Sequence, residues 1–254
     1  GVLMETEIWP NVQHEAARSG LPMVLANARL SARSQRRGER LRALLHPAAR
    51  RLSLALAQTV APAAPSPEDL RLHTDWPFLQ RYAAENAVDR DLPAARRRVV
   101  FIGDSITQGW RDSHPDFFAG NGFLGRGIGG QVTAQMLVRF WPDVVALKPA
   151  AVHILAGIND IAQNAGPYDP AATQANLMAM TTLAQASGIA VILATVTPAA
   201  EFPWRPGLGP IAKVAALNAW LRAYAAEHGA VLADYTRVLD DGAGGMKPGL
   251  AYDG

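Results

Sequence analysis

Five short apolar segments that alternate with helical patterns constrain the fold of this chain most strongly. Apolar runs with strand character predict β-strands at residues 98–102, 123–128, 151–156, 189–196 and 230–235. Between and after them, helices are predicted at residues 106–111, 132–147, 171–187 and 211–228. Pro142 is expected to kink or split the second of these helices, because proline has no N–H to donate within a helix. This alternation predicts an α/β protein with a doubly wound, five-stranded parallel sheet over residues 98–254.

A second, shorter alternation occupies residues 1–59. Strands are predicted at residues 2–4, 22–26 and 52–57, with helices at 11–19 and 31–45 between them. The pattern is βαβαβ, which predicts a small piece of parallel sheet. Residues 60–97 are expected to form an Ala/Pro-rich linker and then a helix over residues 78–87, which Asp75 is positioned to cap.

Composition and charge exclude several functional classes. The chain has no cysteine, so disulfides, thiolate zinc sites and a cysteine nucleophile are excluded. No apolar run reaches the roughly 18 residues that span a bilayer. Residues 101–254 carry nine basic against twelve acidic side chains, so we do not expect a nucleic-acid partner. The basic excess lies in residues 1–59, where a solvated helix face or a nucleic-acid or anionic-lipid patch would explain it. Its core is Arg33, Arg36, Arg37, Arg40 and Arg42.

Polar and glycine-rich motifs follow the first three strands of residues 98–254. They are Gly103-Asp104-Ser105, Arg126-Gly127-Ile128-Gly129-Gly130-Gln131 and Gly157-Ile158-Asn159-Asp160. A Gly-Asp-Ser tripeptide alone is weak evidence, since it occurs in many turns. In a parallel sheet, however, the three turns converge on one edge, where such sheets bind ligands. A hydroxyl, backbone N–H groups and a side-chain amide gathered there suit acyl transfer, in which an oxyanion needs preorganised donors.

The three motifs, in this order, resemble those of the SGNH hydrolases, also called GDSL esterases or lipases. The resemblance covers residues 98–254 and implies a flavodoxin-like, three-layer α/β/α fold. It implies that Ser105 is the nucleophile and that Gly130 and Asn159 are oxyanion donors. It further implies a cofactor-free ester hydrolase that acts on a small-molecule ester, either an acetylated carbohydrate or a lysolipid. A periplasmic or secreted location is expected for this part.

The last block of the family reads Asp-x-x-His, and here the sequence departs from it. Asp253 matches the aspartate, while the histidine would fall two residues after Gly254, so impaired activity is expected for these 254 residues. His153 is expected to be a sheet residue and His228 to close a helix, which leaves His114 as the best substitute base.

The other carboxylates have structural interpretations. Asp104 is expected to hold turn backbone, and Asp160 to cap the loop after the third strand. A metal site made of Asp104, Asp160 and Asp253 would fit no known ligand pattern, so none is predicted. Phe202 and Trp204 either line a substrate pocket or are loop aromatics without a function.

Residues 3–59 resemble a different family, the Kdo (3-deoxy-D-manno-octulosonic acid) transferases. The resemblance rests on residues 4–11 (METEIWPN) and 24–31 (VLANARLS). It implies a partial Rossmann-like fragment, located at the cytoplasmic membrane face. The alternatives to an esterase are therefore a Kdo transferase of lipopolysaccharide biosynthesis and an inactive chimeric fragment. We hypothesise that two unrelated reading frames are joined near codons 50–70, which sequencing across that region would test.

Overall fold

The computed structural model describes residues 2–3, 18–19, 24–28, 54–57 and 66–250, and it divides the chain into two compact units, Gly1–Ser66 and Pro67–Gly254. In the first unit, strands β1 (Val2–Leu3), β2 (Val24–Ala28) and β3 (Leu54–Ala57) pair in parallel in this order. The three strands predicted there are confirmed. The Arg-rich helix predicted at residues 31–45 lies outside the described residues, as does most of the helix predicted at 11–19.

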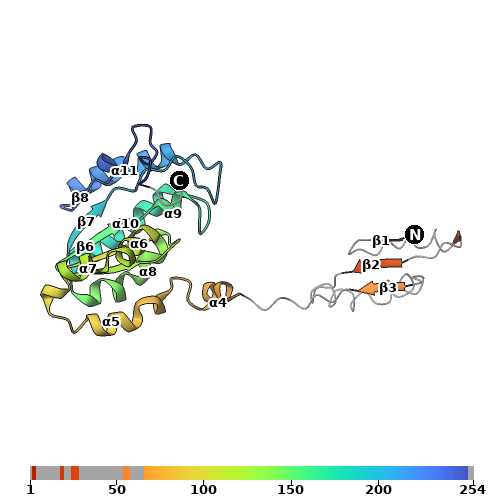
Figure 1. The fold of residues 1–254 in the computed structure, drawn as a ribbon, viewed down its shortest axis with the longest axis horizontal. Helices are drawn as coiled ribbons and strands as arrows, with labels where there is room; N and C mark the ends of the chain where they lie inside the picture. Colours follow the sequence, from red (N-terminus) through yellow and green to blue (C-terminus); the bar gives the residue numbers. More distant parts are fainter. Residues whose placement is uncertain (1, 4–17, 20–23, 29–53, 58–65, 251–254) are drawn as a thin grey trace. The chain divides into compact units, whose positions relative to one another are not determined.

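The second unit is built on a five-stranded parallel sheet with the order β5-β4-β6-β7-β8. Figure 1 shows β6, β7 and β8 following one another along this unit. The strands are β4 (Val99–Gly103), β5 (Phe123–Gly127), β6 (Ala151–Leu155), β7 (Ala190–Ala194) and β8 (Val231–Ala233). All five were predicted within a few residues, and the order is the flavodoxin-like one, so the predicted fold class is confirmed.

Seven helices accompany the sheet between residues 105 and 239. They are α6 (Ser105–Ser113), α7 (Pro115–Asn121), α8 (Thr133–Asp143), α9 (Ile158–Ile161), α10 (Pro170–Ala186), α11 (Pro210–Glu227) and α12 (Thr236–Leu239). The four predicted helices correspond to α6, α8, α10 and α11. The predicted split at Pro142 is confirmed, because α8 ends one residue later and a 3-10 turn, η3 (Val145–Leu147), follows. The other three helices are too short to show a helical period in the sequence.

Right-handed crossovers explain why helices cover both faces of this sheet. The sheet order requires α6 to lie on one face and α8, α10 and α11 to lie on the other. On the second face, Val100 and Ile102 of β4 are fully buried in a core that Phe140 and Met180 share. The intervening Phe101 points to the opposite face. On that face, the Phe101 ring contacts four other aromatic rings, those of Trp110, Phe118, Phe123 and His153.

The segment before the sheet is fastened to it by polar side chains. It contains α4 (Pro67–Thr74), η1 (Leu79–Tyr82), α5 (Ala83–Asp89) and η2 (Ala94–Arg96). The Asp75 carboxylate accepts hydrogen bonds from the N–H groups of Leu79 (2.7 Å) and Gln80 (3.0 Å), which confirms its predicted capping role. The helix predicted at residues 78–87 starts as the 3-10 turn η1, because Phe78 adopts a left-handed φ of 59°.

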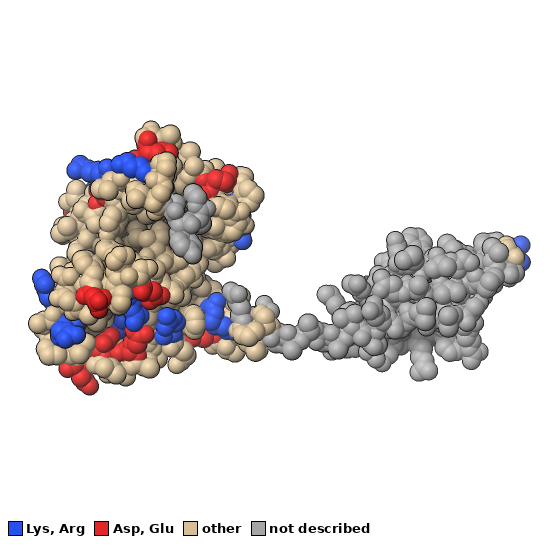
Figure 2. Space-filling view, viewed as in Figure 1, with Lys and Arg blue, Asp and Glu red and all other residues tan. Residues whose placement is uncertain are grey.

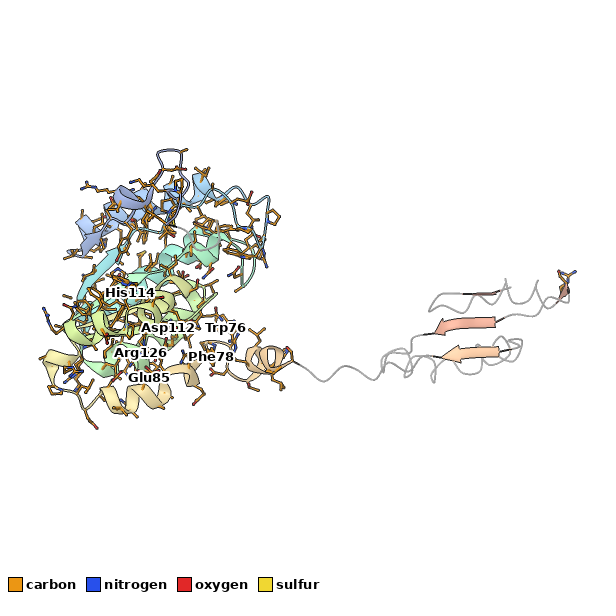
Figure 3. The ribbon with its side chains drawn as sticks, viewed as in Figure 1. Trp76, Phe78, Glu85, Asp112, His114 and Arg126 are labelled. Carbon is orange, nitrogen blue, oxygen red and sulfur yellow. The ribbon has the colours of Figure 1, made fainter. Side chains whose placement is uncertain are left out.

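Arg126 of β5 connects this segment to the sheet. Its guanidinium is buried, donates to Asn86 Oδ1 at 2.8 Å and pairs with Asp89. Glu85 lies beside it and pairs with Arg111 at 2.8 Å (Figure 3). Figure 2 shows acidic and basic side chains interspersed over this part of the surface. These pairs fix the α5 segment against the strands that carry the candidate site.

A second buried arginine, Arg139 of α8, ties together the strand ends. It donates hydrogen bonds to the carbonyl oxygens of Gly103 (3.0 Å) and Arg126 (2.8 Å), the first in the last residue of β4. Its ion-pair partner is Asp143, at 2.8 Å, and both side chains are almost completely buried. Burial lowers the pKa of Arg139, and the attraction of Asp143 opposes this effect. Arg139 therefore fixes the edge of the sheet at which the polar motifs gather.

Candidate active site

The three polar motifs meet where the strand order reverses. β4 lies between β5 and β6, so the connections that leave β4 and β6 run to opposite sides of the boundary between them. In open parallel sheets this boundary forms the ligand crevice at the carboxyl ends of the strands. Ser105 directly follows β4, Gly130 follows β5 and Asn159 follows β6. The tertiary structure thus brings three of the four predicted site residues to one edge.

Ser105 is the first residue of α6, and its side chain is exposed. Its N–H has no partner in a preceding helical turn, since the first N–H groups of a helix are unpaired. Asp104 is the N-cap, and its Oδ1 accepts from the Ile106 N–H at 2.9 Å, which confirms the predicted turn-holding role. Burial raises the pKa of Asp104 to about 6, and its Oδ2 has no partner among the described residues.

The loop after β5 lies against the start of α6. The Gly129 N–H donates to Gln108 Oε1 at 2.9 Å, and a Cβ added at Gly129 would lie 3.7 Å from the Ser105 Cβ. Gly130 has a φ of +75°, a left-handed conformation that glycine adopts without a steric penalty. Among the hydrogen bonds of residues 66–250, none uses the Gly130 N–H as donor. This N–H is therefore available to a ligand beside Ser105.

The Asn159 side chain is 5% exposed and held by two hydrogen bonds. Its Nδ2 donates to the Gln131 carbonyl oxygen at 3.1 Å, and its Oδ1 accepts from Asn164 Nδ2 at 2.9 Å. A primary amide has two N–H groups. One N–H of Asn159 therefore remains for a ligand at the crevice.

Asp160 has a different role from the predicted one. Instead of capping its own loop with its side chain, it accepts from the N–H (3.0 Å) and the hydroxyl (2.6 Å) of Thr133, the first residue of α8. The N-cap position of α8 is Val132, which has no side-chain acceptor, so the carboxylate of another segment satisfies this helix end. Burial raises the pKa of Asp160, and the Thr133 hydrogen bonds oppose the shift.

Two histidines of the described residues, His153 and His228, have structural environments. His153 is buried, stacks on Phe101 at 4.7 Å and contacts the Tyr235 hydroxyl at 3.0 Å through Nε2. Burial lowers its pKa to about 4, which confirms the sheet role over a catalytic one. The His228 ring Nδ1 lies 3.1 Å from the Tyr224 carbonyl oxygen at the end of α11, as predicted. His114 lies between α6 and α7 (Figure 3).

Asp253, the fourth predicted site residue, lies outside the described residues. Within the described residues no group of three or more His, Asp or Glu side chains is placed to hold a metal ion. In the part of the chain that the structure describes, no helix is long and apolar enough to cross a membrane.

The sequence did not single out Asn164 or Gln108, which contact the candidate site. Asn164 donates to Asn159 and to the Gly130 carbonyl oxygen (3.3 Å), and it accepts from Trp204 Nε1 at 3.4 Å. The only signal for Asn164 was its place in a short loop of turn-forming residues. Of the two loop aromatics, Trp204 is 54% exposed beside this site, whereas Phe202 is buried in the core.

A doubly wound α/β sheet with polar groups gathered at its switch point is the usual architecture of an α/β enzyme. The model of the GDSL-like Lipase/Acylhydrolase family matches residues 101–254, and the chain belongs to this family of carboxylic ester hydrolases.

Solved structures are similar to more than half of the chain. A Bacteroides fragilis protein assigned as an acylhydrolase is 46% identical, with a TM-score of 0.66, over 71% of this chain and 88% of that one. A GDSL-like lipase from Bacteroides thetaiotaomicron is 42% identical, with a TM-score of 0.67, over 71% and 89%. A G-D-S-L family protein from Desulfitobacterium hafniense is 25% identical, with a TM-score of 0.53, over 62% and 88%.

The N-terminal unit matches a different family. Residues 1–65 match the 3-deoxy-D-manno-octulosonic-acid transferase (kdotransferase) model, which confirms the resemblance seen in the sequence. The curated transferases of Haemophilus influenzae (57 residues) and Bordetella pertussis (59 residues) are each 46% identical. These segments cover 22% and 23% of this chain and only 13% and 14% of those proteins.

Proposed function

We propose that this protein hydrolyses small carboxylic esters through an acyl-enzyme formed on Ser105. The observation that carries the proposal is the convergence of an exposed hydroxyl, the unpaired Gly130 N–H and one free N–H of Asn159 at the switch point of the sheet. These are the nucleophile and the donors that acyl transfer needs.

In the proposed reaction, the Ser105 Oγ attacks the ester carbonyl carbon while its proton passes to a general base. The oxyanion that forms accepts hydrogen bonds from the N–H groups of Ser105, Gly130 and the Asn159 side chain. Collapse of this intermediate breaks the bond to the alcohol, which leaves with the proton from the base. Water then attacks the acyl-enzyme by the same route and releases the carboxylic acid. No step calls for a cofactor.

The resemblance assigns the general base to the histidine of the block that Asp253 opens, with Asp253 as its orienting partner. Within residues 66–250, no histidine hydrogen-bonds to Ser105. Added imidazole therefore makes a direct test of the base. If residues 1–254 hold a competent nucleophile without a base, imidazole will stimulate ester cleavage by the wild-type chain above the rate with imidazole alone, whereas Ser105→Ala with imidazole will match the rate with imidazole alone.

Two substrate classes follow from the resemblance, acetylated carbohydrates and lysolipids. The hollow beside α6, lined mainly by Ile106, Leu155, Ile158 and Val196, is too narrow even for a water molecule, so it does not choose between them. A series of esters with acyl chains of increasing length distinguishes the two classes.

Hydrolysis of p-nitrophenyl acetate, butyrate and octanoate tests the proposal. We expect Ser105→Ala to remove activity on all three esters, while Ser113→Ala, at the exposed end of the same helix, keeps it. The chain length that is cleaved fastest decides between the two substrate classes. A fluorophosphonate probe should label Ser105 alone, as seen by mass spectrometry of peptides. Equal rates for Ser105→Ala and wild type, or labelling at another residue, would reject the assignment.

We assign no transferase activity to the N-terminal unit. The segments that match curated Kdo transferases cover only 13–14% of their length. A Kdo-transfer assay on the same preparation should give no product, and deletion of residues 1–65 should leave the esterase rate unchanged.

A further inference from the structure

Among the described residues, Asn164 is the one side chain that hydrogen-bonds both to Asn159 and to Gly130, the residues that carry two of the three proposed oxyanion donors. It lies in the loop between α9 and α10 and is itself exposed. Its Nδ2 donates to Asn159 Oδ1 at 2.9 Å and to the Gly130 carbonyl oxygen at 3.3 Å. Its Oδ1 accepts from the Trp204 indole N–H at 3.4 Å. Both N–H groups and one acceptor site of this amide are therefore in use.

We propose that Asn164 is a positioning residue for ester hydrolysis, which orients the Asn159 amide toward the oxyanion and holds the Gly130–Gln131 peptide, next to the proposed Gly130 N–H donor. The inference rests on the proposed function, because it assumes that these two groups stabilise the oxyanion. Asn164 does not touch the reacting atoms and acts only through its neighbours.

The orientation of the Asn159 amide follows from the donors and acceptors around it. In the observed orientation, Nδ2 faces the Gln131 carbonyl oxygen and Oδ1 faces the Asn164 Nδ2. A flipped amide would place oxygen against the Gln131 oxygen and nitrogen against the Asn164 nitrogen. Asn164 supplies the only donor to Asn159 Oδ1 among the described residues, so its loss removes one of the two contacts that favour this orientation of the amide. A flipped Asn159 would present oxygen to the oxyanion and repel it.

The second bond acts on the loop after β5. The Gly130 carbonyl accepts from Asn164, and the N–H of the same peptide unit, that of Gln131, donates to the Ile128 carbonyl oxygen at 3.3 Å. These two contacts hold the Gly130–Gln131 peptide from both sides, and this peptide adjoins the one that carries the proposed Gly130 N–H donor. Because Gly130 has a left-handed φ and no side chain, few other contacts restrict it.

The Trp204 contact links this arrangement to the loop after β7. Arg205 of that loop donates to the Gln163 carbonyl oxygen, directly beside Asn164. Trp204 also packs on Phe202 at 5.3 Å, and Phe202 is anchored in the core. The loop thus supports Asn164 through Trp204, whose indole is itself exposed.

Steady-state kinetics with p-nitrophenyl acetate test the inference in the full chain. We expect Asn164→Ala to lower kcat about 10-fold with KM within twofold of wild type, because the bonds matter most when charge develops in the transition state. Asn164→Asp should lower kcat further, since its carboxylate would face the oxygens of Asn159 and Gly130. Trp204→Phe keeps the packing on Phe202, and its kcat should fall no more than threefold. Gln163→Ala, next in the chain, is the matched control and should keep wild-type kcat.

A double-mutant comparison separates this inference from the proposed function. Asn159→Ala should lower kcat by about 10²–10³, and adding Asn164→Ala should cost less than twofold more, because residues that act through one group are not additive. If Asn159→Ala keeps wild-type kcat, the proposed oxyanion site is wrong. If Asn159→Ala is impaired while Asn164→Ala matches wild type, or if the two losses multiply, only the positioning role is wrong.

A spectroscopic readout decides the inference independently of the rate. The Asn159 side-chain N–H₂ pair should give two separate proton resonances in ¹⁵N-edited spectra, identified by their loss in Asn159→Ala. In Asn164→Ala this pair should shift and broaden as the amide begins to flip, whereas in Gln163→Ala it should not. An unchanged pair in Asn164→Ala would overturn the proposal.

Discussion

Gly127→Ala tests whether the end of β5 sets the position of the proposed nucleophile. A Cβ at residue 127 would lie 2.2 Å from the Gln108 N, 2.7 Å from the Asp104 carbonyl oxygen and 2.7 Å from the Thr107 carbonyl carbon. Ordinary contacts begin near 3.4 Å, so α6 would have to move by roughly 1 Å. All three atoms are backbone atoms, and no side-chain rotation can relieve the overlap.

We expect this displacement to lower both stability and activity. Overpacking of this kind costs about 1–3 kcal/mol in the free energy of unfolding. A reacting group misplaced by about 1 Å can lose about 100-fold in rate. The measurements are urea unfolding followed by circular dichroism, and kcat for p-nitrophenyl acetate at a temperature where the variant is fully folded.

Gly109→Ala is the matched control on the same helix. No atom lies within 4 Å of a Cβ added there, and alanine is the better helix former by about 1 kcal/mol. This variant should be as stable as wild type or more so, with unchanged kcat. A Gly127→Ala variant with wild-type stability and wild-type kcat would show that the contact between β5 and α6 does not position Ser105.

Two further changes test the interior of the C-terminal unit. Burial lowers the pKa of His153 from 6.5 to about 4, so the stability that its neutral form provides is present above pH 6.5 and is lost as the pH falls toward 4. In His153→Phe, the free energy of unfolding should therefore fall by about 3 kcal/mol less between pH 7 and pH 4 than in wild type. Denaturant unfolding at pH 7 and at pH 4 measures this difference. An equal pH dependence in both proteins would contradict the neutral, buried imidazole. Arg139→Met leaves Asp143 buried without its cation and should cost about 3–5 kcal/mol in urea unfolding. Arg139→Met with Asp143→Leu should cost less, because the unpaired charge is gone and only the hydrogen bonds to neutral partners, such as the Gly103 and Arg126 carbonyl oxygens, stay lost. Similar costs for the two would argue against an ion-pair effect.

The sequence predicted more of the candidate site than of the contacts that support it. Ser105, Gly130 and Asn159 were found because each lies just after an apolar strand, and strand ends are visible in the local pattern. Asp75 and Asp104 were likewise predicted as caps, since a cap bonds to backbone only two to five residues away.

The interactions that the sequence missed join residues far apart in the chain. Asp160 caps a helix that begins 27 residues earlier, at Thr133. Asn164 reaches the Gly130 carbonyl across 34 residues, and Arg139 reaches that of Gly103 across 36. Such pairs depend on which loops the sheet brings together, and residue spacing carries no information about them.

By itself, the sequence determined the strands, the helices and the polar residues at the strand ends, because hydrophobic periodicity and turn chemistry act over a few neighbouring residues. Only the tertiary structure decided that β5 and β6 flank β4 on opposite sides. Because of this strand order, three separate turns form one candidate site, with an exposed hydroxyl, an unpaired backbone N–H and a hydrogen-bonded side-chain amide. The physical reason is that strand order is set by the packing of both sheet faces at once, and no single segment encodes it.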